Sequence, residues 1–340
     1  MTDAVASTRD GFGDRLLFAA LACGLLAAFL LSLLVGPAAI GFGDVMAGLF
    51  HGDLGTTAII VQEIRLPRAV LGLTIGATLG LSGAALQGFL RNPLAEPGLV
   101  GISASAAFGA VVTFYTGLAA TFALAVPLGG MAGAGIAVLV VQLLAGRNGS
   151  PLSLILAGIA VTSFAGALTS LALNIAPNPY AALEIMFWLM GSLADRSFDH
   201  VWLAAPFMAL AWVLLLGLGR PLDALTLGED AAQTLGFDLR GVRHRLVIGC
   251  ALGVGAATSV AGAIGFIGLV VPHLLRPLAR HRPSVLLPAS AIGGAILTLA
   301  ADVAVRLLSP ERELKLGVLT ALIGAPFFLI LVLRTRREMP

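Results

Sequence analysis

The sequence predicts an all-α membrane protein, a polytopic bundle of about ten transmembrane helices with both termini in the cytoplasm. Composition is the first reason, because 58% of the 340 residues are hydrophobic and 11% are charged, a balance that soluble domains do not show. The second is a series of apolar runs about as long as the roughly 20 residues with which a helix crosses a bilayer. The third is the grouping of Lys and Arg in short clusters between those runs, which orients the helices.

Nine apolar runs follow one another along the chain, separated by short polar turns. They lie near 16–36, 67–88, 99–117, 120–145, 152–175, 201–219, 246–275, 286–305 and 316–333. The first run has the position of a signal peptide, but its length of about 20 residues and the acids ahead of it favour a span that is retained.

The run at 246–275 decides the topology. As a single span that starts in the cytoplasm, it would place the arginines that follow it and the RTRRE tail outside, against the rule that basic residues stay inside. Two short spans that turn near residues 261–263 return both clusters to the cytoplasm and give ten spans. The chain is then one transmembrane domain, 1–340, with cytoplasmic tails at 1–15 and 334–340 and a cytoplasmic loop at 220–245.

Two further segments have a predicted place in this bundle. In the run at 67–88, Gly72, Gly76 and Gly80 keep one helix face bare, so that a neighbouring helix can approach closely. Segment 184–195 is too short to span and too apolar for a free loop. We expect it to lie as an interfacial helix on the outer face, with the splayed start of the sixth span as the alternative.

The outer face carries few positive charges in this topology. Six basic residues fall there, namely Arg65, Arg68, Arg196, Arg306, Arg312 and Lys315. Arg65 and Arg68 begin one span and Arg306 ends another. These three side chains either reach toward lipid phosphates or dock an acidic soluble partner, since guanidinium pairs with carboxylate in two-point geometry.

The loop at 220–245 is the longest polar segment on the cytoplasmic side. Within it, Glu229 and Asp230 follow Gly228, and Gly236 comes six residues after Asp230. Acids in the first turn and a glycine stop predict a short helix. Many short helices without a special role have the same pattern, so the pattern alone does not indicate a function.

The stretch RNPLAEP, residues 91–97, ends the glycine-rich helix with two prolines, an amide and one acid. Proline leaves backbone carbonyls unpaired, and in a membrane such backbone is tolerated only where protein or a water-filled cavity satisfies it. The stretch is therefore a gate candidate, and a plain helix-ending turn is the alternative.

Several motifs occur together in a fixed order: RLPR, SGAALQGFLRNPLAEPGLVGIS, LGEDAAQTLG, AGAIGFIGLVVPHLLR, ADVAVR and GVLTALIGAPFF. They resemble the motifs of permease subunits of iron-chelate and cobalamin importers of the ATP-binding-cassette class. The resemblance covers nearly the whole chain. It implies a homodimer of ten-helix subunits in the bacterial inner membrane, two cytoplasmic ATPase subunits, and one bilobed binding protein docking outside.

The resemblance also implies roles for particular residues. Docking of the binding protein falls to Arg65, Arg68 and Arg306. The cytoplasmic gates comprise Asn92 and Leu94, and a second group of Ser150, Pro151 and Leu152, where the family commonly has polar residues. The loop that couples to the ATPase comprises Leu227, Gly228, Glu229, Asp230, Ala231, Ala232, Leu235 and Gly236. Lys315 stands where the family usually has proline, which leaves its role open.

Other classes of function fit the sequence less well. A Walker A loop needs a lysine after its glycines, and the single lysine is in an outward loop, so ATP and Mg²⁺ belong to a separate subunit and this chain is not an enzyme. An ion-coupled secondary transporter, the more remote alternative, would place carboxylates or histidines at the bilayer midplane. A net charge of +2 without a basic face gives no indication of nucleic-acid binding.

The expected cargo is a whole iron chelate, a ferric siderophore or haem, with cobalamin as the alternative. A bare cation would need carboxylates, imidazoles or thiolates along its path, and we predict no metal site and no cofactor in this chain. The predicted lining is small and neutral instead, with Gly158, Thr162, Ser163 and Thr169 on the fifth span.

Overall fold

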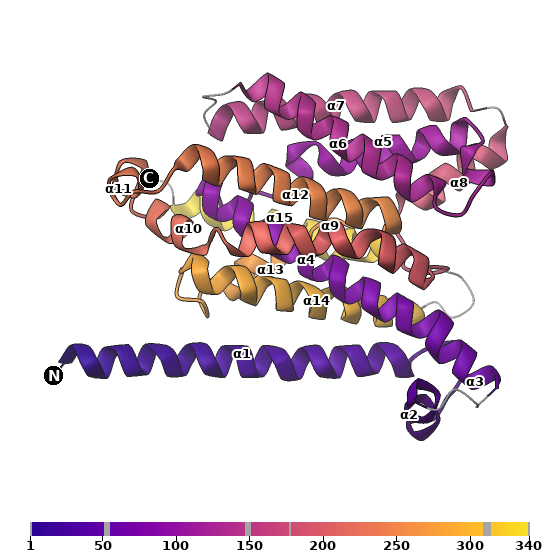
Figure 1. Ribbon diagram of the computed structural model, residues 1–340, viewed down its shortest axis with the longest axis horizontal. Helices are drawn as coiled ribbons and strands as arrows, with labels where there is room; N and C mark the ends of the chain where they lie inside the picture. Colours follow the sequence, from indigo (N-terminus) through magenta and orange to yellow (C-terminus); the bar gives the residue numbers. More distant parts are fainter. Residues whose placement is uncertain (1, 51–54, 147–150, 177, 309–313, 339–340) are drawn as a thin grey trace.

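The computed structural model describes residues 2–50, 55–146, 151–176, 178–308 and 314–338, and within these ranges it is all-helical. The long helices run roughly parallel to one another (Figure 1). The start of α1, the end of α15 and the short helices α10 and α11 all lie at one end of the bundle, and α2, α3 and α8 lie at the other. This agrees with the prediction that both termini share a side with the loop at 220–245.

The first half of the chain contains α1 (Thr2–Leu34), α2 (Phe42–Phe50), α3 (Thr56–Ile59), the π-helical turn η1 (Ile60–Arg65) and α4 (Leu66–Leu90). The 3₁₀ turn η2 (Pro97–Val100), α5 (Ile102–Tyr115), η3 (Leu118–Ala120), α6 (Ala125–Ala145) and α7 (Pro151–Asn174) follow. The second half contains α8 (Pro179–Leu189), α9 (Phe198–Leu216), α10 (Gly219–Leu225), α11 (Glu229–Thr234), α12 (Leu239–Ala261), α13 (Ile267–Leu275), α14 (Pro283–Leu308) and α15 (Leu316–Glu338).

Eight helices of the described residues are long and apolar enough to cross a membrane. The predicted run at 246–275 is indeed broken: α12 ends at Ala261 and α13 begins at Ile267. Counting the shorter apolar helices α5 and α13 as spans, and α8 as interfacial, would give the predicted ten. That all ten cross the bilayer remains a prediction.

The segment predicted at 184–195 is a helix of its own, because α8 ends at Leu189 and α9 begins only at Phe198. It is therefore not the splayed start of the next span. Its helix begins earlier than expected, at Pro179, where the side chain of Asn178 accepts a hydrogen bond from the backbone N–H of Ala181 at 2.9 Å.

Helix α4 forms the centre of the bundle, between α14 on one side and α9, α12 and α13 on the others. The bare glycine face predicted for it is confirmed. A side chain at Gly76 or Gly80 would collide with backbone of α14, at Gly294 and Ser290 respectively. Lipid provides no hydrophobic driving force for helices to associate, so the close packing of these two backbones stabilises the pair instead.

Candidate functional site

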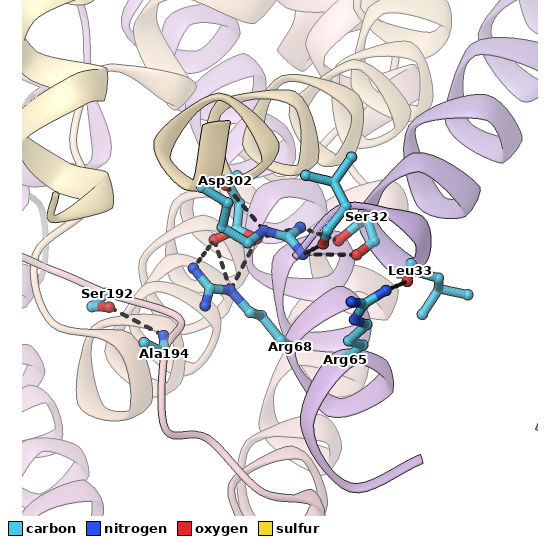
Figure 2. A network of polar contacts seen from close by, with 9 residues as sticks. Ser32, Leu33, Arg65, Arg68, Ser192, Ala194 and Asp302 are labelled. Atoms are coloured by element: carbon cyan, nitrogen blue, oxygen red, sulfur yellow. Dashed lines mark hydrogen bonds and ion pairs between the residues drawn. The ribbon is translucent and has the colours of Figure 1, made fainter. Parts of the chain in front are cut away.

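At one end of the bundle, two arginines share a single buried carboxylate (Figure 2). Arg68, near the start of α4, donates two hydrogen bonds to Oδ1 of Asp302 on α14. One comes from its Nε at 3.0 Å and one from its Nη2 at 2.8 Å. Arg306, one turn further along α14, places its Nη2 2.9 Å from Oδ2 of Asp302. The Asp302 side chain is 1% exposed, so a strongly desolvated charge is compensated from two sides.

The same arginine group also holds the end of α1. Arg65 donates from Nη1 to the backbone oxygens of Leu33, at 2.7 Å, and Leu34, at 2.9 Å. Arg306 donates from Nη1 to the backbone oxygen of Ser32 and from Nη2 to its hydroxyl, both at 2.8 Å. The last carbonyls of a helix lack partners within the helix and carry partial negative charge, so cations bind there favourably.

This arrangement differs from what the sequence suggested for Arg65, Arg68 and Arg306. Neither lipid phosphate nor an external partner is needed to satisfy them, because all three bond within the chain. The cluster contains three guanidinium groups and one carboxylate, however, and Arg65 bonds only to backbone oxygens of α1, so the cluster retains an excess of positive charge. Docking of an acidic partner stays a prediction, and the spacing of Asp302 and Arg306 by four residues was the available sign of an internal pair.

At the opposite end of α4, the predicted gate turn is a tight, hydrogen-bonded structure. Arg91 ends the helix in the left-handed region, with φ of 48°. The backbone N–H of Leu94 donates to Oδ1 of Asn92 at 2.9 Å, and that of Ala95 donates to the backbone oxygen of Asn92 at 3.2 Å. Asn92 therefore orders this turn, as an Asx residue commonly does, and the Leu94 side chain is half-buried.

The second predicted gate is only partly within the described residues. Ser150 lies outside them, and Pro151 begins α7. The side chain of Leu152 is 63% exposed. Any gate role for these three residues stays a prediction.

The predicted coupling loop contains the expected short helix, α11, with Glu229 and Asp230 in its first turn. Both flanking glycines adopt positive φ, 110° at Gly228 and 88° at Gly236. Ala232 faces inward and is fully buried. Leu227 and Leu235, on either side of the helix, are 72% and 61% exposed, so the loop offers an apolar surface at the end of the bundle.

Two contacts of the gate turn escaped the sequence analysis. Arg91 places Nη2 3.8 Å from Oε1 of Glu229, which links the end of α4 to α11 across a half-exposed ion pair. Glu96 accepts a hydrogen bond from the backbone N–H of Phe266 at 2.6 Å. Burial raises the pKa of the Glu96 carboxyl, and the hydrogen bond from Phe266 opposes that rise.

Of the four predicted lining residues on α7, Gly158, Thr162 and Thr169 lie on one side of the helix and Ser163 lies on the other. Gly158 is buried, with its carbonyl close to Gly101, while Ser163 is exposed. Thr162 and Thr169 are half-buried and donate to carbonyls of their own helix, at Gly158 (2.8 Å) and Ala165 (2.9 Å). Among the residues that the structure describes, no group of three or more His, Cys, Asp or Glu side chains could hold a metal ion.

Comparisons with known proteins cover most of the chain. The model of the FecCD transport family matches residues 24–334. The cobalamin import system permease protein BtuC of Halobacterium salinarum is 42% identical over 289 residues, 84% of this chain and 76% of that protein. The vitamin B12 import system permease protein BtuC of Salmonella paratyphi A is 40% identical over 316 residues, 92% of this chain and 93% of that protein. Among solved structures, an inward-facing ABC transporter of metal-chelate type has a TM-score of 0.83 at 31% identity, over 94% of this chain and 99% of that chain.

Proposed function

The chain belongs to the FecCD transport family and is an ABC importer permease, and from this premise we propose that its cargo is a cobalamin. The two relatives at 40–42% identity are named for cobalamin or vitamin B12 import. This supports the alternative of the sequence analysis over its first choice. A ferric siderophore or haem becomes the second candidate, favoured by the likeness to a transporter of metal-chelate type at 31% identity.

The observation that carries the transport mechanism is the arrangement of the gate turn beside the coupling loop. The turn at 91–97 and α11 are joined by Arg91 and Glu229, and α11 is flanked by exposed leucines. An ATPase subunit that seats α11 would bury those leucines. It would thereby gain a mechanical connection to the end of α4, next to Asn92 and Leu94.

The remaining parts of the machine are proposed from the family. Two copies of this chain would enclose the path, with two ATPase subunits at the α11 end and a binding protein at the end that carries the arginine cluster, in the inner membrane of a bacterium. The excess positive charge of Arg65, Arg68 and Arg306 suits acidic side chains of that binding protein. Its affinity should fall only weakly as salt is raised, because Arg65 and Arg306 are 4% and 7% exposed and salt screens buried charges much less than exposed ones.

Uptake by the reconstituted system tests the cargo. The permease, its ATPase and its binding protein are placed in liposomes, and labelled cobalamin, ferric siderophore, haem and free manganese or zinc are offered separately. We expect ATP-dependent uptake of cobalamin and none of the free ions. Uptake of a siderophore or haem without cobalamin would move the assignment to the second candidate. Uptake of free ions alone would contradict both.

A further inference from the structure

The connection between α12 and α13 is packed tightly against two other segments. A side chain at Gly262 would collide with the backbone oxygen of Trp188, at the end of α8. One at Gly317, at the start of α15, would collide with the backbone oxygens of Met190 and Ala263. The backbone N–H of Ser192 also donates to the oxygen of Ala261 at 2.8 Å. The first residues of the connection are therefore fixed by backbone contacts.

The last residue of the connection, Phe266, has an unfavourable backbone. Its φ is 67°, in the left-handed region that bulky residues avoid. Its carbonyl nevertheless accepts from the N–H groups of Leu269, at 3.1 Å, and Val270, at 2.9 Å, and so starts α13. Such a conformation persists only where neighbours hold it in place.

Glu96 supplies one such neighbour. It comes from the gate turn, 170 residues earlier in the chain, and its Oε1 accepts the Phe266 N–H at 2.6 Å. The next residue, Pro97, packs on Gly268, where an added side chain would meet the Pro97 ring at 2.8 Å. The end of the gate turn thus lies on the first turn of α13, with a carboxylate at the positive end of that helix.

We propose that Glu96 is a positioning residue, a carboxylate latch that holds the gate turn at 91–97 against the start of α13. This inference rests on the proposed gate role of Asn92 and Leu94. On its other side, the turn has the half-exposed pair of Arg91 and Glu229. A short charge-assisted hydrogen bond to a part-buried carboxylate is stronger than a half-exposed ion pair at 3.8 Å. The turn therefore keeps its place relative to α13 when its contact with α11 changes.

The proposed latch predicts how fast a cysteine at position 94 reacts with a reagent dissolved in water. Leu94→Cys is introduced in the full-length chain with the exposed native Cys23 replaced by serine, while Cys250 is buried and stays. Labelling by a water-soluble maleimide is then timed in lipid nanodiscs. Glu96→Ala should speed labelling by about tenfold, the change expected for loss of one charge-assisted hydrogen bond. Glu96→Gln keeps an acceptor oxygen but loses the charge, so it should give an intermediate rate, about threefold above the parent.

The control is Glu63→Ala, since Glu63 is an exposed acid near the opposite end of α4. It should leave labelling unchanged. If Glu96→Ala does not accumulate, Glu96→Asp, which is one methylene shorter, should show faster labelling than Glu96→Gln. Equal rates for Glu96→Ala and the parent, or for Glu96→Asp and Glu96→Gln, would overturn the latch.

This measurement uses no cargo, ATPase or binding protein, so it separates the latch from the proposed function. Cargo-loaded proteoliposomes then provide the second measurement. Faster labelling together with faster leakage of cargo supports both the latch and the gate. Faster labelling with unchanged retention of cargo supports the latch and contradicts the gate role of Leu94.

Discussion

The carboxylate of Asp302 connects two helices and, through Arg306, the end of a third. It is 1% exposed and contacts both Arg68 and Arg306. We expect Asp302→Ala to lower the free energy of unfolding by about 3–5 kcal/mol, because removing one member of a buried ion pair leaves uncompensated charge. Thermal unfolding of the detergent-solubilised permease measures the loss. Glu229→Ala, which breaks the half-exposed pair with Arg91, is the control and should cost no more than about 1 kcal/mol. Equal stabilities of the two variants would contradict this account.

The partners of individual charged residues were the hardest feature to predict from sequence. The bonds from Arg68 to Asp302 and from Phe266 to Glu96 join residues 234 and 170 positions apart. Sequence patterns show which helix ends are charged, but the pairing depends on which helices pack together. Asn92 was easier, because its hydrogen bond to Leu94 spans two residues and belongs to the turn itself.

At the scale of helices, close backbone contact between α4 and α14 makes a sharp prediction. Gly80→Ala should destabilise the permease, because the new methyl group would collide with the backbone oxygen of Ser290. Overpacking typically costs about 1–3 kcal/mol, and rigid backbone cannot move aside cheaply. Gly135→Ala on α6 is the matched control, since nothing lies within 4 Å of the added atom. It should be neutral or stabilising, because alanine favours helix by about 1 kcal/mol. The apparent melting temperatures of the two variants decide the matter.

The glycines on either side of the predicted coupling helix α11 are required for their backbone conformation, not because a side chain there would collide with a neighbour. Nothing lies within 4 Å of a side chain added at Gly228 or Gly236. Gly228, however, has φ of 110° and ψ of 161°, a region essentially restricted to glycine and costly by about 1–3 kcal/mol for other residues. Gly228→Ala should therefore reorient α11 and lower ATP-driven uptake or copurification of the ATPase. Gly236, with φ of 88°, should accept asparagine, which tolerates positive φ. Normal uptake by Gly228→Ala would contradict a seated helix.

The long apolar helices followed from the sequence because their signals are local. Apolar length predicts where each span lies, and the positions of arginines predicted the break between α12 and α13, which begins at Gly262. The shape of that break could not be predicted. Its course depends on glycines from three separate segments, Gly191, Gly262 and Gly317, that approach one another in the folded bundle.

At the scale of the whole molecule, α1 and α7 lie along opposite edges of the bundle (Figure 1). In the proposed homodimer, the path lies between two copies of the chain, with part of α7 facing it. A residue that faces a twofold axis on one copy lies near the same residue on the other. Ser163, which is exposed on α7, should therefore lie close to its own counterpart, whereas the exposed Cys23 of α1 should face lipid.

Thiol cross-linking in the native membrane measures this arrangement. Ser163→Cys, treated with a short bifunctional maleimide, should yield a species of twice the chain mass, and the parent chain with Cys23 alone should stay at single mass. Cys250 is buried and does not compete. A second cross-linking readout uses co-expressed chains with two different tags, so that a homodimer gives a band with both tags. If Ser163→Cys gave no dimer while Cys23 did, the copies would meet along α1. The path would then have to be sought away from α7.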